Sequence, residues 1–336
     1  MDICIATAQE ISYLIVHHPM YSGLGCLVVA VSLLKFYCRL TLGVCECDQD
    51  MTGNTVLITG ASAGIGKATA FDMARRGARV LLACRNKGKA DKVADEIRHT
   101  TGNQNVVVYV MDLCSFDSVR KCAGEVLKAE KRLDVLINNA GITGTTPQEM
   151  TEDGCEKIMQ SNHLGSFLFT LLLLDLLKKS APSRIVNVSS AAKNFAKFDV
   201  DDLVNKKKLS PMAVYSNTKL ANVLFTVELA ERLAGTGVTV NALHPGCVAT
   251  DIFNGKTGAI LFFTRVLFWV VAKSSEEGAQ TTILLAVDPS LEKTTGKYFV
   301  DCKEEKLSKA DTDKQVAKRL FEISEKIVGT SLTIKT

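Results

Sequence analysis

The sequence predicts an α/β fold built on one doubly wound, mostly parallel seven-stranded sheet with helices on both faces. Three observations lead to this fold class. From residue 55 onward, short β-branched runs alternate with longer amphipathic stretches, which is the pattern of repeated βαβ units. A glycine-rich turn at 59–66 directly follows the first run and opens the first amphipathic stretch. The composition is 47% hydrophobic and 23% charged over 336 residues, which suits a globular chain with a sizeable core.

The elements follow in order along the chain. Strands are expected at 55–59, 79–84, 106–111, 135–138, 184–189, 238–243 and 297–300. Helices are expected to fill the intervals at about 65–76, 87–99, 115–130, 151–179, 211–234, 275–287 and 312–327. Right-handed crossovers place all seven strands in one sheet, so residues 51–336 are predicted to form a single domain.

Residues 1–50 are predicted to be a membrane anchor and linker. Residues 11–34 contain no Lys, Arg, Asp or Glu, and the second half of this stretch is strongly apolar. A helix needs roughly 20 apolar residues to cross a bilayer. Lys35 and Arg39 follow the apolar run, so the positive-inside rule places the rest of the chain in the cytosol. A buried or interfacial helix and a cleaved signal peptide are the alternatives, although the first ten residues lack the basic residue that a signal peptide carries.

A second apolar stretch, 258–272, lies within an expected substrate loop at about 247–274. Arg265 interrupts it, and 15 residues are too few to span a bilayer comfortably. We expect an interfacial helix that covers a lipophilic pocket or dips into the membrane surface, with a core helix as the alternative.

Charge and cysteine content exclude several classes of protein. The net charge of +4 is too balanced for a nucleic-acid-binding protein, so no nucleic-acid partner is expected. Eleven cysteines are an odd number and lack metal-ligand spacing, which argues against a disulfide framework and against a metal site.

The glycine-rich turn predicts a dinucleotide site. Glycines permit a tight strand-to-helix turn and let backbone N–H groups approach a diphosphate. Ala68 after Lys67 rules out a Walker phosphate loop, which needs Ser or Thr there. The cofactor-binding residues predicted in the turn are Gly60, Ala61, Ser62, Ala63, Gly64, Ile65 and Gly66.

The end of the second strand predicts NADP(H) rather than NAD(H). No carboxylate is present there to hold a ribose 2′-hydroxyl. Arg85 instead offers a guanidinium suited to a 2′-phosphate, with Asn86 beside it and Lys87 as a second positive charge.

Tyr215 and Lys219 predict carbonyl chemistry. Side chains at i and i+4 are neighbours on a helix, and a nearby ammonium is expected to lower the pKa of the tyrosine toward working pH. Such a phenol can act as a general acid when a carbonyl is reduced. Ser190, at the end of the fifth strand, can bind the substrate oxygen or merely cap a loop. Asn162 could be functional or could merely satisfy neighbouring backbone groups.

Taken in order, these motifs resemble those of the short-chain dehydrogenase/reductase family over about residues 53–330. They are Gly60-x-x-x-Gly64-x-Gly66, the run Asn138 to Gly141, Ser190, Tyr215-x-x-x-Lys219 and His244-Pro245-Gly246. The segments at 81–86, 162–167, 218–226, 235–246 and 296–302 are similar to those of its retinol dehydrogenase branch, in which an N-terminal anchor is usual.

The resemblance implies a Rossmann-type fold and a catalytic tetrad. Tyr215 would be the acid/base, Lys219 would bind the nicotinamide ribose, Ser190 would orient the carbonyl, and Asn162 would hold a water in a proton relay. The other cofactor contacts that it implies are Asp112 and Leu113 at the adenine, the turn Asn139, Ala140 and Gly141, and Pro245, Gly246, Val248 and Thr250 around the nicotinamide. Residues 191–193 and 248–251 depart from the usual pattern, which leaves the exact substrate open.

The sequence therefore predicts an NADP(H)-dependent oxidoreductase that interconverts a lipophilic alcohol and its aldehyde or ketone, with retinol and retinal as the favoured pair. Steroid, fatty-aldehyde and other isoprenoid substrates are the alternatives on the same fold, and a dinucleotide-binding scaffold without turnover is a remote one. The expected location is the endoplasmic reticulum membrane with the catalytic domain facing the cytosol. The oligomeric state stays open, with a homodimer among the options.

Overall fold

The computed structural model describes residues 19–143, 148–204, 209–248 and 272–332. The chain divides into two units, one of Met1–Leu42 with Thr257–Ala272 and the other of Gly43–Lys256 with Lys273–Thr336. We call the second of these the sheet unit. The boundary near residue 42 lies close to the predicted end of the anchor and linker at residue 50.

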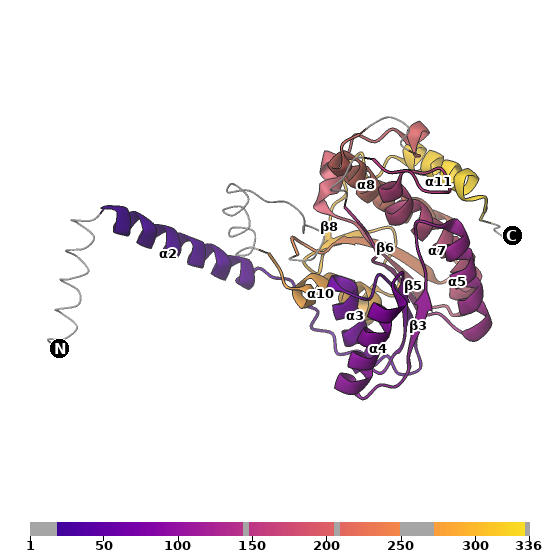
Figure 1. Cartoon of the computed structure of the whole chain (residues 1–336), viewed down its shortest axis with the longest axis horizontal. Coiled ribbons are helices and arrows are strands. Elements are labelled where there is room, and N and C mark those ends of the chain that lie inside the picture. Colours follow the sequence, from indigo (N-terminus) through magenta and orange to yellow (C-terminus); the bar gives the residue numbers. More distant parts are fainter. Residues whose placement is uncertain (1–18, 144–147, 205–208, 249–271, 333–336) are drawn as a thin grey trace. The chain divides into compact units, whose positions relative to one another are not determined.

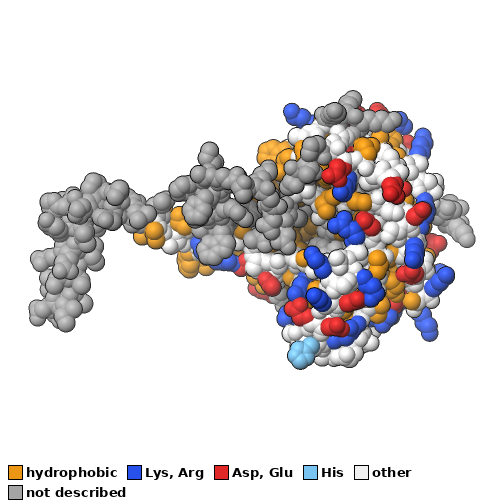
Figure 2. Space-filling model, viewed as in Figure 1, with side chains coloured by type: hydrophobic (Ala, Val, Ile, Leu, Met, Phe, Trp, Pro, Cys, Tyr) orange, Lys and Arg blue, Asp and Glu red, His pale blue; other side chains and the backbone are white. Residues whose placement is uncertain are grey.

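In the first unit, α2 (Pro19–Leu40) is the helix that the structure describes (Figure 1). Its described side chains include the exposed residues Val28, Val29, Leu33 and Phe36. Apolar side chains are visible along this part of the helix in Figure 2. Nowhere in the described ranges is a helix long and apolar enough to cross a membrane. Residues 11–18 of the predicted uncharged stretch lie outside the described residues.

The sheet unit contains a sheet of eight described strands in the order β3-β2-β1-β4-β5-β6-β7-β8. Neighbouring strands pair in parallel except at the β7–β8 edge, which is antiparallel. The strands are β1 (Thr55–Thr59), β2 (Arg79–Cys84), β3 (Val106–Val110), β4 (Val135–Asn138), β5 (Ser183–Val188), β6 (Val238–His244), β7 (Tyr298–Val300) and β8 (Lys303–Glu305). The predicted fold class is confirmed, but the predicted count of seven strands was one short. The short β8 reads Lys-Glu-Glu and is exposed, so it carries no hydrophobic pattern to reveal a strand.

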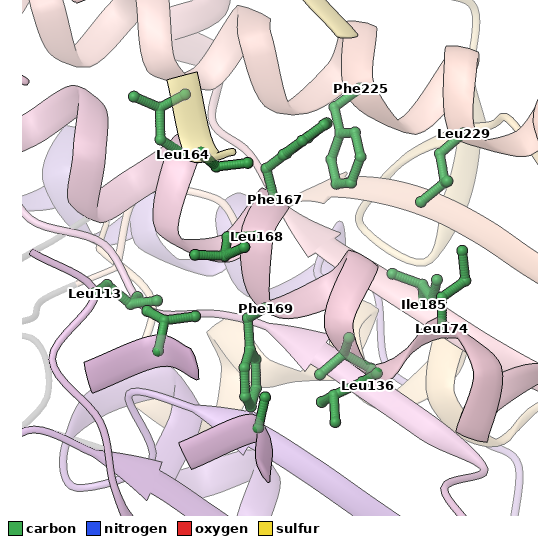
Figure 3. Close-up of a cluster of buried hydrophobic side chains, with 14 of the residues drawn as sticks. Leu113, Leu136, Leu164, Phe167, Leu168, Phe169, Leu174, Ile185, Phe225 and Leu229 are labelled. Atoms are coloured by element: carbon green, nitrogen blue, oxygen red, sulfur yellow. The ribbon is translucent and has the colours of Figure 1, made fainter. Parts of the chain in front are cut away.

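Helices cover both faces of this sheet (Figure 1). One face carries α3 (Gly64–Arg75), α4 (Lys87–Thr101) and α10 (Ser275–Val287), and the other carries α5 (Phe116–Ala129), α7 (Gly165–Lys179), α8 (Pro211–Arg232) and α11 (Lys314–Val328). Alternate strand residues enter the two cores: Leu57 and Leu136 on one face, Val56 and Ile137 on the other. Figure 3 shows the core beneath α7 and α8, where Phe167 and Phe225 pack with their ring centroids 5.0 Å apart.

The helix predicted at 151–179 starts later and is interrupted. Gly154 adopts a positive φ of 74°, and Met150 and Glu156 form a bridge, so residues 151–156 make a turn. The helix begins with α6 (Lys157–Met159), where the Glu156 side chain accepts a hydrogen bond from the backbone N–H of Met159. A π-helical turn, η1 (Gln160–Leu164), then connects α6 to α7. Such turns are frequent at functional sites.

The predicted loop at 247–274 falls mostly outside the described residues, as do Thr250 and nearly all of the predicted interfacial helix. Its two ends meet, because Val248 and Lys273 form a parallel bridge and the Lys273 N–H donates to the Cys247 carbonyl over 2.8 Å. Residues 249–271, between these two ends, lie outside the described residues.

Candidate active site

A cavity of about 550 Å³ lies at the carboxyl edge of the sheet. Its lining combines the glycine turn after β1, the ends of β2, β3 and β4, and side chains from α8. The strand order reverses between β1 and β4, and open α/β sheets bind ligands at this switch point. The fold thus brings most of the predicted site residues to one place.

The glycine turn is shaped for a phosphate group. Gly60 has a φ of 69°, and a Cβ there would lie 2.9 Å from the Ala140 Cα. A Cβ on Gly66 would lie 2.6 Å from the Gly60 carbonyl oxygen, so both positions require glycine. No side chain caps α3, whose N-cap is Ala63. The first N–H groups of the helix therefore remain available to an anion, which fits a diphosphate. All of the predicted turn residues line the cavity except Ala61, which is buried beneath it.

Thr59 and Asn139 hold this turn against the end of β4. The Thr59 hydroxyl accepts hydrogen bonds from the N–H groups of Asn139 and Ala140, each over 3.0 Å. The Asn139 amide donates to the Thr59 carbonyl over 2.8 Å. Sequence reasoning missed Thr59. The signal that could have revealed it is a hydroxyl at the last strand position before the first glycine.

Two cations line the far end of the cavity. Arg85 is exposed and forms no hydrogen bond or ion pair with any residue that the structure describes, which leaves its guanidinium available to a 2′-phosphate. The second cation is Lys89, which the sequence analysis did not name. The prediction that Lys87 supplies the second positive charge is wrong. Its Nζ pairs with Asp91 over 2.7 Å, and Lys87 does not line the cavity. Asn86 is the N-cap of α4. Because the helix begins there, Lys89 and not Lys87 lies toward the cavity.

Asp112 and Leu113 follow β3, which lies beside β2 on the side away from β1. Asp112 accepts a hydrogen bond from the Cys114 N–H over 2.9 Å, and both residues line the cavity next to Met111. A carboxylate beside two apolar side chains suits the edge and face of an adenine ring. The residues present therefore fit NADP(H) from its diphosphate to its adenosine phosphate.

At the opposite end of the cavity, Tyr215 and Lys219 project from α8. The Lys219 Nζ lies 5.5 Å from the centroid of the Tyr215 ring and donates to the Val188 carbonyl over 3.0 Å. Burial lowers the pKa of Lys219 to about 8. Burial raises the pKa of Tyr215, while a hydrogen bond from Ser190 lowers it. The predicted lowering by Lys219 is not seen: burial and Ser190 are the causes of the shift in the pKa of Tyr215.

Asn162 lies in the π-helical turn and is buried. Its Oδ1 accepts from the Ile142 N–H over 2.8 Å, and its Nδ2 donates to the Ile142 carbonyl over 2.9 Å. Of the two roles considered for Asn162, the hydrogen bonds to the Ile142 backbone match the one in which its side chain satisfies neighbouring backbone groups. The residue remains close to the reacting groups, because a Cβ on Gly141 would lie 3.4 Å from the Lys219 Nζ and 3.6 Å from the Asn162 Oδ1.

The predicted nicotinamide contacts are only partly brought together. Pro245 lines the cavity, whereas Gly246 and Val248 do not. Val248 instead packs toward α10, since a Cβ on Gly278 would lie 2.6 Å from its Cγ2. Thr250 lies outside the described residues. Ser275, which the sequence analysis missed, lines the cavity at the start of α10.

This arrangement suits hydride transfer coupled to proton transfer. When bound, the nicotinamide supplies or accepts the hydride. Ser190 can hold a carbonyl oxygen beside Tyr215, and the phenol can give that oxygen a proton. Lys219 brings a buried ammonium to the same end of the cavity, where it can hold a ribose hydroxyl.

Comparisons with known proteins agree with this geometry. The short chain dehydrogenase family matches residues 54–259. Human retinol dehydrogenase 14 is 47% identical over 83% of this chain and 87% of its own length, and human retinol dehydrogenase 13 is 44% identical over 92% and 94%.

Solved structures share the fold. An uncharacterized protein from Mycobacterium paratuberculosis has a TM-score of 0.69 and 32% identity, covering 85% of this chain and 97% of its own. A short chain dehydrogenase from Shigella flexneri, complexed with NADP, has a TM-score of 0.59 and 25% identity over 76% and 100%. The glycine turn, Tyr215 and Lys219 line one cavity, and Ser190 follows Ser189 at its edge. Together with the family match and the retinol dehydrogenase relatives, this places the chain in the short-chain dehydrogenase family.

Proposed function

We propose that the protein interconverts retinol and retinal with NADP(H) as cofactor. The observation that carries this proposal is one continuous cavity with Arg85 and Lys89 at one end and Tyr215 and Lys219 at the other. The retinol dehydrogenases that cover most of the chain support the choice of a retinoid among lipophilic carbonyl compounds.

The cofactor preference follows from charge. Two cations with no ion pair among the described residues can bind a 2′-phosphate, and no carboxylate follows β2 to compete for a ribose hydroxyl. Since cells keep NADP mostly reduced, the favoured direction is reduction of retinal, and the same residues serve oxidation when concentrations reverse.

The proton step is assigned to the side chains of Ser190 and Tyr215. Hydrogen bonding with Ser190 lowers the pKa of Tyr215, so the two hydroxyls are close enough to converge on one carbonyl oxygen. The proton passes from Tyr215 to that oxygen as the carbonyl carbon receives the hydride. Positioning and these preset hydrogen bonds are expected to provide most of the acceleration.

A substrate panel tests the proposal. The full chain, in membranes or detergent, is assayed for NADPH oxidation with all-trans-retinal, a steroid ketone and a long-chain aldehyde. Preferred turnover of retinal supports the proposal. Preferred turnover of the steroid ketone or of the long-chain aldehyde would mean that this compound class, and not a retinoid, is the substrate. Turnover of none of them would favour the non-catalytic scaffold. Tyr215→Phe is expected to lower kcat by about 10²-fold or more, the contribution of a general acid.

We further propose that residues 1–50 attach the enzyme to the endoplasmic reticulum membrane with the sheet unit in the cytosol. The uncharged stretch at 11–34, the cations Lys35 and Arg39 after it, and the exposed apolar side chains of α2 support this location. Carbonate extraction and protease protection of microsomes test it: release by carbonate or protection of the sheet unit would contradict it. Crosslinking in the same membranes tests whether the enzyme is a homodimer.

A further inference from the structure

A buried ion pair lies close to the serine but has no part in the chemistry above. The Lys193 Nζ lies 2.7 Å from the Asp311 Oδ2, and the two side chains are 5% and 3% exposed. Lys193 belongs to η2 (Ala191–Phe195), the 3₁₀ turn that begins directly after Ser190. Asp311 comes 118 residues later, in the loop before α11.

We propose that Lys193 and Asp311 are positioning residues that hold the Ser190 hydroxyl beside Tyr215. The turn that contains Lys193 closes on the serine itself. The Lys193 N–H donates to the Ser190 carbonyl over 3.1 Å, and the Ala192 N–H donates to the Ser190 Oγ over 3.2 Å. Displacement of Lys193 therefore displaces both the backbone and the hydroxyl of Ser190.

Asp311 is also held in place by contacts within its own loop. Its Oδ2 accepts the Ser308 N–H over 2.8 Å, and its own N–H donates to the Ser308 hydroxyl over 3.4 Å. The loop leads into α11, whose Leu320 and Phe321 are buried in the core shared with α8. Because Tyr215 is on α8, the carboxylate links the serine turn to the framework that carries the tyrosine.

The surroundings of the Lys193 ammonium leave it few other partners. It donates to the Asn194 Oδ1 over 3.1 Å and lies 5.0 Å from the centroid of the Tyr298 ring. Removing the carboxylate would leave a buried cation without its counter-ion, which is strongly destabilising. A movement of the Lys193 ammonium toward water would relieve this. Such a movement would pull the turn away from Tyr215.

The test compares Asp311→Asn with wild type in the NADPH-dependent reduction of all-trans-retinal. Misplacement of a reacting group by about 1 Å can cost about 10²-fold in rate, so we expect kcat to fall by about 10- to 100-fold. The dissociation constant of NADPH should stay within about twofold, because Arg85 and the glycine turn are on other strands. Unchanged kcat, or NADPH affinity lost to the same extent as kcat, would overturn the inference.

Two further variants separate positioning from loss of stability. Glu130→Gln breaks the Arg79–Glu130 pair, whose carboxylate is 4% exposed although the Arg79 side chain is 37% exposed. This pair lies far along the chain from η2. The Glu130→Gln variant should lower the Tm and leave kcat unchanged. The double variant Lys193→Met/Asp311→Asn removes both charges and should recover Tm without recovering kcat. Recovery of kcat together with Tm would show that only stability was involved.

This inference rests on the proposed function, since the assay uses retinal. The two fail in different ways. If wild type does not reduce retinal but reduces another carbonyl, the proposed substrate is wrong and the variants are compared on the accepted one. If wild type reduces retinal and Asp311→Asn does so equally well, only the positioning role is wrong.

Discussion

The Lys219 Nζ lies 5.5 Å from the centroid of the Tyr215 ring while it donates to the Val188 carbonyl. In the protein alone, the ammonium therefore satisfies a backbone oxygen at the end of β5. Ser190, and not Lys219, is the residue that lowers the pKa of the tyrosine. The lysine lies at the nicotinamide end of the cavity with its charge buried. Burial of this charge lowers the stability of the fold, and the loss of stability can be measured.

Replacement of this lysine should stabilise the fold at neutral pH. Burial lowers the pKa of Lys219 to about 8 from 10.5, so between these values the unfolded chain binds more protons and wild-type stability rises with pH. At pH 7 the buried charge opposes folding. Lys219→Met should therefore raise Tm by at least about 3 °C at pH 7. Val188 would retain a donor, the Asn222 Nδ2 at 3.4 Å.

Calorimetry across pH 7 to 11 checks this expectation. The advantage of Lys219→Met should shrink as pH rises and disappear above about pH 10.5, where both states of wild type have lost the proton. Lys87→Met, at an exposed residue, should show no such trend. A variant less stable than wild type at pH 7 would mean that the ammonium is not a net cost.

Loss of the serine hydroxyl should move the pH profile of the reaction. Ser190 lowers the pKa of Tyr215, so Ser190→Ala should raise that pKa further. In retinol oxidation the tyrosine must be deprotonated to accept the proton, and the rising limb of kcat/KM should shift to higher pH. Stopped-flow assays from pH 8 to 11 measure it. A limb that stays in place while kcat falls would assign Ser190 to carbonyl binding alone.

The cofactor cations provide a matched pair of variants. Arg85→Ala and Lys89→Ala should each weaken NADPH binding, by about 10-fold or more for the arginine with its charge-assisted hydrogen bonds, and should leave NADH binding nearly unchanged. Lys87→Ala is the control, because Lys87 pairs with Asp91 on the helix surface. Fluorescence titration with both nucleotides measures the difference. Equal loss for NADPH and NADH would place these cations away from the 2′-phosphate.

Local patterns predicted most of the fold and the reacting groups. The turn at Gly60 and Gly66 was predictable because only glycine tolerates those backbone approaches. Tyr215 and Lys219 were predictable because helical spacing alone makes them neighbours. In each case the physical cause lies within a few residues of the chain.

Features that depend on helix phase or distant contacts were not predictable. Lys89 faces the cavity because α4 begins after its N-cap Asn86. Several polar residues lie near this point, so the sequence does not fix where the helix begins. Lys193 is buried because Asp311 meets it from the loop before α11. In the sequence alone, both lysines look like ordinary surface charges.

Asn162 allows the backbone role and the relay role to be separated. Asn162→Ala removes two hydrogen bonds to Ile142 and one to Thr218, and leaves the half-buried N–H and carbonyl of Ile142 unpaired, which costs at most about 1–3 kcal/mol for each group. We expect a Tm lowered by several degrees together with reduced kcat, because the same bonds hold the turn at Gly141 against Lys219. Thr218→Val is the milder comparison: it removes the 3.2 Å bond from the Asn162 amide and the 2.7 Å bond to the Tyr215 carbonyl, and it leaves both bonds to Ile142 in place. Calorimetry beside turnover decides: lower kcat at unchanged Tm would mean that Asn162 acts on the proton relay and that the bonds to Ile142 contribute little to stability.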